Sequence, residues 1–250
     1  TVDLWDTARK AEAFDASKHT FAATEPKHGF GSAPPSLVIF HQSRCGSTVV
    51  SNALSQLPNS RVYSEPTAPL HALQACEQHN TCDANSQQSL LRDVFYMMGR
   101  STTPLRVFYK ISSIATRNID TFARAMPDTP WIFVYRKPVE ILMSHFKHYQ
   151  WGQNLPSNHV PNCLRQYRQK EQHPTLVSLL QLKNYTMESI TRQDYCAAYL
   201  ASLAYAAISQ HNNNNNNMTT NNNVVQAHDA PSKHKITTTH HHWFVNYESL

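Results

Sequence analysis

Short apolar runs alternate with stretches of helical spacing along most of the chain. The apolar runs, which we expect to be strands, are residues 36–41, 61–64, 105–110, 131–135 and 243–247. The stretches with apolar residues three or four positions apart, which we expect to be helices, are 47–57, 70–76, 89–99, 119–126, 138–149 and 194–208. Because the expected strands are apolar on both faces, the pattern predicts an α/β fold of three layers, with a central parallel sheet flanked by helices.

The composition changes at both ends of this pattern. Residues 1–35 are mostly polar and end in Pro34-Pro35, so we expect an N-terminal leader or stem. Residues 36–250 are expected to form one domain, which we expect to be C-terminally incomplete because the chain stops just after a strand. The Asn-rich segment predicts a disordered insertion at about 211–239. Residues 150–175 are rich in polar side chains and are expected to form a surface loop.

The charge balance is mildly basic, with 22 Lys and Arg against 17 Asp and Glu. This excess suits an anionic substrate but is also ordinary for a soluble protein. No block of five like charges occurs, so no nucleic acid partner is expected. No apolar run approaches the ~18 residues of a membrane span, so no anchor is seen in this sequence. The Golgi lumen and the cytoplasm both stay open as locations.

The five cysteines form no CxxC pair, so a zinc site is not expected. Free thiols are the favoured interpretation, and a local disulfide between Cys76 and Cys82 is the alternative. Three adjacent histidines at 240–242 cannot all face one ion from a strand. The sequence therefore predicts no metal site.

The candidate chemistry lies directly after the expected strands, where ligands bind in open parallel sheets. The residues at these positions are Arg44 to Thr48, Glu65, Lys110, Arg136 and Glu248. The first group is a small-residue turn that leads into a helix, and a helix N-terminus offers free backbone N–H groups to an anion. Two of these residues are carboxylates, and the others are cations or hydrogen-bond donors. This composition predicts a site that holds several anionic groups and contains a base. We expect Glu248 to be structural.

The turn differs from the nucleotide-binding pattern GxxxxGK[ST]. If Gly46 is the second glycine of that pattern, His41 stands in place of the first and Ser47 in place of the lysine. The strand at 131–135 is followed by Arg136 rather than by an Asp that could hold Mg²⁺. Group transfer without a metal is therefore favoured over phosphorylation.

Three segments resemble the sulfotransferase family. SRCGST followed by LPNSRVYSEP resembles its 5′-phosphosulfate segment, closer to the carbohydrate and tyrosyl-protein branch than to the cytosolic branch. WIFVYRKPVEILMSH resembles its 3′-phosphate segment, and FVNYESL resembles a late strand. The resemblance implies a P-loop-type fold and 3′-phosphoadenosine 5′-phosphosulfate (PAPS) as co-substrate. It also implies a hydroxyl-bearing acceptor, which is a glycan, a protein or a small molecule.

The resemblance also implies roles for individual residues. The turn residues that would surround the 5′-phosphosulfate are Ser43, Arg44, Cys45, Gly46, Ser47 and Thr48. Arg136 and Ser144 would bind the 3′-phosphate. Glu65 would take the proton from the acceptor hydroxyl, and Lys110 would neutralise charge on the bridging oxygen. We expect His145 and His148 to be surface residues rather than catalytic ones.

Two alternatives stay open. The first is a P-loop kinase-like phosphotransferase, against which the missing loop lysine argues. The second is a non-catalytic nucleotide-binding or glycan-binding protein that has kept the fold. The sequence does not identify the acceptor or the oligomeric state.

Overall fold

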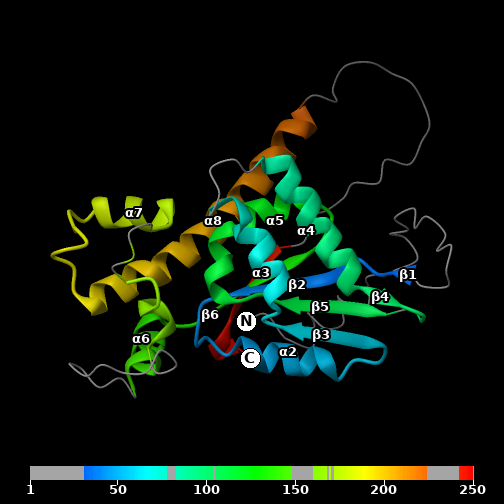
Figure 1. The fold of residues 1–250 in the computed structure, drawn as a ribbon, viewed down its shortest axis with the longest axis horizontal. Coiled ribbons are helices and arrows are strands. Elements are labelled where there is room, and N and C mark those ends of the chain that lie inside the picture. Colours follow the sequence, from blue (N-terminus) through cyan, green and yellow to red (C-terminus); the bar gives the residue numbers. More distant parts are fainter. Residues whose placement is uncertain are drawn as a thin grey trace.

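A five-stranded parallel sheet forms the centre of the described part of the molecule (Figure 1). The computed structural model describes residues 31–77, 83–103, 105–147, 160–167, 169, 172–223 and 242–249, and for residues 214–223 and 249 only the backbone. The strands are β2 (Pro35–His41), β3 (Ser60–Ser64), β5 (Arg106–Lys110), β6 (Trp131–Tyr135) and β7 (His242–Asn246), in the order β3-β5-β2-β6-β7. The predicted α/β fold with a parallel sheet between helical layers is confirmed.

Helices cover both faces of this sheet. They are α2 (Ser47–Ser55), α3 (Thr67–Gln74), α4 (Ala84–Met98), α5 (Ile119–Ala125), α6 (Pro138–Phe146), α7 (Pro174–Gln181) and α8 (Arg192–Asn223). The 3₁₀ turns are η1 (Ala75–Glu77), η2 (Ser113–Asn118), η4 (Asn162–Leu164) and η5 (Tyr247–Ser249). Two short strands, β1 (Gly31–Ser32) and β4 (Arg100–Ser101), pair antiparallel outside the main sheet. No described helix combines the length and the apolar character needed to cross a membrane.

Alternate residues of each strand point into two separate cores, as the pleat of a strand requires. One core contains Leu37, Ile39, Ile132 and Val134 from the strands, and it packs against α2, α6, α7 and the first half of α8. The other core takes the intervening strand residues and packs against α3, α4 and α5. Figure 1 shows α2 on one side of the sheet and α3, α4 and α5 on the other. This double burial explains why the strands are apolar on both faces.

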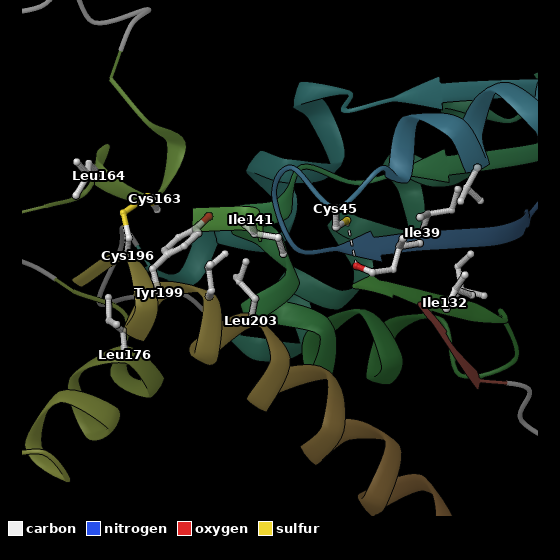
Figure 2. Close-up of a cluster of buried hydrophobic side chains, with 14 of the residues drawn as sticks. Ile39, Cys45, Ile132, Ile141, Cys163, Leu164, Leu176, Cys196, Tyr199 and Leu203 are labelled. Carbon is white, nitrogen blue, oxygen red and sulfur yellow. Dashed lines mark hydrogen bonds between the residues drawn. A yellow bond between two sulfur atoms is a disulfide. The ribbon is translucent and has the colours of Figure 1, made fainter. Parts of the chain in front are cut away.

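A disulfide between Cys163 and Cys196 joins η4 to α8. Figure 2 shows it beside Leu164, Leu176 and Tyr199 at the edge of the first core. Cys76 is also disulfide-bonded, whereas Cys45 is free and buried. The interpretation of the cysteines as free thiols is therefore wrong for Cys76, Cys163 and Cys196. Sequence spacing could not show the bridge, because its two cysteines are 33 residues apart.

Helix α8 extends further than the sequence pattern predicts. The expected helix ends at 208 and is followed by a disordered insertion, but the helical backbone continues to Asn223. Each residue added to an existing helix gains a hydrogen bond without a new nucleation cost, and this offsets the low helix propensity of Asn. Residues 1–30, 148–159 and 224–241 lie outside the described residues, and with them lie most of the leader, His148 and most of the insertion.

Candidate active site

The turn after β2 leads directly into the first turn of α2. Arg44 and Gly46 both have positive φ, at 62° and 86°, and the helix begins at Ser47. No side chain caps this helix, and its N-cap residue is Gly46. An uncapped first turn leaves backbone N–H donors for an anion. The turn thus combines a left-handed backbone at two positions with an uncapped helix start.

The side chains of this turn point in different directions. Arg44 is exposed, whereas Ser43 and Ser47 are buried. Ser43 Oγ accepts a hydrogen bond from Asn162 Nδ2 at 3.3 Å, which ties the turn to η4. Cys45 Sγ donates to the carbonyl oxygen of Val134 at 3.2 Å, as the dashed line in Figure 2 shows. Burial raises the pKa of the Cys45 thiol to about 11, so this side chain is a neutral core residue.

Tyr247 lies directly against Gly46. A Cβ atom at position 46 would come within 2.1 Å of the Tyr247 ring. The guanidinium carbon of Arg136 lies 4.9 Å from the centre of the same ring. Tyr247 follows β7, so it joins the turn after β2 to the residue after β6. Sequence analysis singled out its segment, FVNYESL, but not this residue.

Arg136 and Ser144 come from the end of β6 and from α6. Arg136 Nε forms an ion pair with Glu140 one helical turn away. The neighbouring Lys137 Nζ lies 2.9 Å from Glu248 Oε1, which agrees with a structural role for Glu248. Ser144 is half-buried on α6. A phosphate at Arg136 would therefore compete with the Glu140 carboxylate.

His145, one residue further along α6, is buried rather than on the surface as expected. Burial is the main reason that its pKa falls to about 4, and the charge of Arg44 lowers it further. His145 is therefore neutral at pH 7 and close enough to Arg44 to respond to its charge.

Lys110 and Glu65 meet at the carboxyl edge of the sheet. In the parallel register Ser64 pairs with Lys110, so Glu65 directly follows the paired position. The Glu65 N–H donates to the Lys110 carbonyl at 2.6 Å, and Lys110 Nζ forms an ion pair with Glu65 Oε1. The Lys110 side chain is 5% exposed and the Glu65 side chain 46% exposed. An external molecule can thus reach the carboxylate, while the lysine is held beneath it.

His41 is a third member of this group that sequence analysis did not assign to it. Its Nε2 lies 3.8 Å from Glu65 Oε1, and its Nδ1 donates to the Gln42 carbonyl at 3.0 Å. Burial lowers the His41 pKa to about 4, and nearby Lys110 acts in the same direction. The neutral ring therefore presents the Nε2 lone pair towards the Lys110–Glu65 pair. Its position at the end of β2 was the signal that could have identified it.

The structure brings two predicted groups to one edge of the sheet, since β2 lies between β5 and β6. The turn after β2 is one group, and Lys110 with Glu65 is the other. Among the described residues, no group of three or more His, Cys, Asp or Glu side chains is placed to hold a metal ion.

Comparisons with known proteins give little more. No family model matches the sequence, and no curated protein matches it. Among solved structures, a sulfotransferase from Alicyclobacillus acidocaldarius is similar with a TM-score of 0.36 and 16% sequence identity, covering 70% of this chain and 68% of that chain. A TM-score this low does not support a conclusion about function.

Proposed function

We propose that this protein is a sulfotransferase that moves the sulfuryl group of PAPS to a hydroxyl group of an acceptor. The observation that carries the proposal is the placement of an uncapped anion-binding turn beside the Lys110–Glu65 pair at one sheet edge. The three sequence segments that resemble sulfotransferases support it, because they supply the turn, Glu65 and Arg136.

The turn is suited to the phosphosulfate end of the donor. The backbone N–H groups of the first turn of α2 would bind its oxygens, and Arg44 would add charge from the exposed side of the turn. Gly46 fits this role because neither its φ nor the space beside it admits a side chain. Arg136 and Ser144 would hold the 3′-phosphate after Arg136 leaves Glu140.

Glu65 is placed to act as the base. As the acceptor oxygen attacks sulfur, the Glu65 carboxylate takes the hydroxyl proton. The new S–O bond forms while the bond from sulfur to the bridging oxygen breaks, and that oxygen leaves with the electron pair. Lys110 then neutralises the charge on the leaving oxygen. The buried Lys110 is paired with Glu65. When Glu65 takes up the proton, this pair weakens, and the Lys110 cation becomes available to the leaving oxygen.

Ligand stabilisation tests the donor assignment. In the presence of EDTA, 3′,5′-adenosine bisphosphate is expected to raise the Tm of the chain, because the site needs no metal. Stabilisation by Mg-ATP alone would instead support the kinase-like alternative and overturn the proposal.

Substitution of Glu65 tests the mechanism. Glu65→Gln is expected to keep 3′,5′-adenosine bisphosphate affinity and to lose about 10²–10⁴-fold in transfer from radiolabelled PAPS to a panel of hydroxyl acceptors. Glu188→Gln is the matched control, because Glu188 is an exposed carboxylate outside the site. Equal transfer rates in Glu65→Gln and the control would remove Glu65 as the base. Absence of transfer by the unmodified chain to every acceptor would favour the non-catalytic alternative.

A further inference from the structure

A second candidate site is a polar cavity of about 800 Å³ that lies beside η2, α3 and α5. Its walls come from η1, η2, α5 and the middle of α8, together with Gln166, Gln169 and residues 172–175. The residues that matter most for its chemistry are Glu77, Arg117, Asn118, Gln166 and His173. None of them belongs to the donor site described above.

Arg117 is a buried cation without a carboxylate partner in the described part of the chain. It is only 4% exposed, and its Nη2 donates to the neutral Gln166 Oε1 at 2.8 Å. Its Nε and Nη1 have no hydrogen-bond partner among the described residues. Desolvation lowers the Arg117 pKa from its ordinary value. A buried charge that leaves donors unmatched is costly, and an anionic ligand would offset that cost.

The two acidic residues of these walls, Glu77 and Asp120, are both engaged elsewhere. Asp120 Oδ2 accepts a hydrogen bond from Arg124 Nη1 at 2.9 Å, and Glu77 has partners of its own. Glu77 Oε1 accepts a hydrogen bond from Asn118 Nδ2 at 2.6 Å and lies 3.5 Å from His173 Nε2. With its amide nitrogen occupied, Asn118 keeps a buried Oδ1 that has no partner within the described residues. The cavity thus lacks two things, an acceptor for Arg117 and a donor for Asn118. A ligand that carries an anionic group beside a hydroxyl supplies both.

The cavity shares structural elements with the carboxyl edge of the sheet. Its η2 wall begins three residues after Lys110, and the Thr116 hydroxyl next to Arg117 donates to the His41 carbonyl at 3.2 Å. The Arg117 guanidinium carbon lies 5.7 Å from the centre of the Tyr199 ring. Burial raises the pKa of Tyr199, and the nearby charge of Glu65 acts in the same direction. The cavity and the Lys110–Glu65 pair therefore lie on either side of shared elements.

We propose that this cavity binds a carboxylate or sulfate group on a hydroxylated molecule, with Arg117 as the anion-binding residue and Asn118 as the hydroxyl acceptor. That the molecule is the acceptor substrate rests on the proposed function. In that case the acceptor is an anionic, hydroxyl-rich molecule.

Calorimetric titration of the full chain with three matched sugars tests the proposal. Glucuronate and glucose 6-sulfate share the hydroxyls of glucose but carry a carboxylate or a sulfate. We expect one or both to bind at least about tenfold more tightly than glucose, since a charge-assisted pair contributes roughly 1.5–3 kcal/mol. The stronger of the two identifies the anion. Equal affinity for all three sugars would overturn the proposal.

Substitutions locate the binding site. Arg117→Gln is expected to abolish the preference for the anionic sugar, whereas Arg92→Gln, on α4 and outside the cavity walls, leaves it unchanged. If Arg117→Gln fails to fold, Ser209→Trp serves instead, because Ser209 lines the cavity on α8 and is not buried. Retained preference in a folded cavity variant contradicts the site.

Titration with 3′,5′-adenosine bisphosphate keeps the two proposals distinguishable. If this nucleotide fails to bind the unmodified chain while glucuronate binds through Arg117, the donor assignment fails and the cavity stands. If the nucleotide binds and no anionic sugar is preferred over glucose, the cavity proposal fails alone.

Discussion

At the scale of single residues, Gly46 joins the proposed anion-binding turn to Tyr247. Its φ of 86° is costly for any other residue, and the Tyr247 ring occupies the space of a side chain. The Arg136 guanidinium carbon lies 4.9 Å from the centre of the same ring, so one tyrosine contacts residues from two expected phosphate subsites. The turn geometry therefore depends on a residue 201 positions away in the sequence.

Gly46→Ala is expected to lower the free energy of unfolding by at least about 1–2 kcal/mol, from the left-handed backbone alone, and by more because of the ring. Tyr247→Ala removes the ring that would clash with a Cβ atom at position 46, but it leaves the left-handed backbone of that position unchanged. In urea unfolding, the double variant should therefore lose less stability than the sum of the two single variants. Strict additivity would mean that the ring does not press on position 46.

Sequence patterns identified the residues that follow strands but not their partners. Glu65 and Arg136 come directly after an apolar run, Arg44 lies in the turn after one, and Lys110 is the charged last residue of one. Position and charge together marked these four residues. His41 is the last residue of its strand and is hidden within the run. Its place beside Glu65 depends on the neighbouring strands, which no local pattern encodes.

At the scale of elements, the Cys163–Cys196 disulfide fixes η4 on α8. Asn162, next to Cys163, donates to Ser43 in the turn after β2. The bridge is thus one residue away from a contact that holds the turn in place. Disulfides of this kind persist in oxidising compartments and are rare in reducing ones.

Removal of this disulfide is expected to cost about 3–4 kcal/mol of unfolding free energy, from the closure entropy of a loop of 33 residues. Cys163→Ser, Cys196→Ser and the double variant should all lose nearly the same amount, because each breaks one shared bond. Urea unfolding without reductant measures the losses. If the two single losses add in the double variant, the bridge does not contribute as a bond.

Element boundaries followed the sequence closely where packing and sequence agree. The expected strand at 131–135 is β6 residue for residue, since it is buried on both faces. Helix α8 departed from its pattern, because its second half continues by helix propagation rather than by an apolar face. The disulfide was also beyond prediction, as its cysteines meet only after α8 packs on η4.

At the scale of the whole molecule, three histidines make the fold sensitive to acid, of which His41 and His145 are buried and His173 is half-buried. Burial lowers the pKa values of His41, His145 and His173 to about 4, from an ordinary value of 6.5. Nearby cations act in the same direction: Lys110 on His41, Arg44 on His145 and Arg117 on His173. Two of these cations belong to the candidate active site and one to the second cavity.

The sign of the effect follows from the direction of these shifts. Between pH 6.5 and 4 the unfolded chain binds protons at these histidines that the folded chain does not. The free energy of unfolding therefore falls as the pH falls through this window, by up to about 1.4 kcal/mol per pH unit for each histidine. More than about one pH unit above 6.5 all three are neutral in both states, so they make almost no contribution to the pH dependence there.

Urea unfolding at pH 7, 6, 5 and 4 measures this dependence. His145→Leu is expected to reduce the slope of the unfolding free energy against pH, between pH 6 and 5, by the contribution of one histidine. This expectation holds whatever the substitution does to stability at pH 7. His71→Gln is the matched control, because His71 is exposed on α3 and should leave the slope unchanged. If His145→Leu and the control have equal slopes, His145 takes up its proton as readily in the folded chain as in the unfolded one. Its burial beside Arg44 would then have no electrostatic consequence.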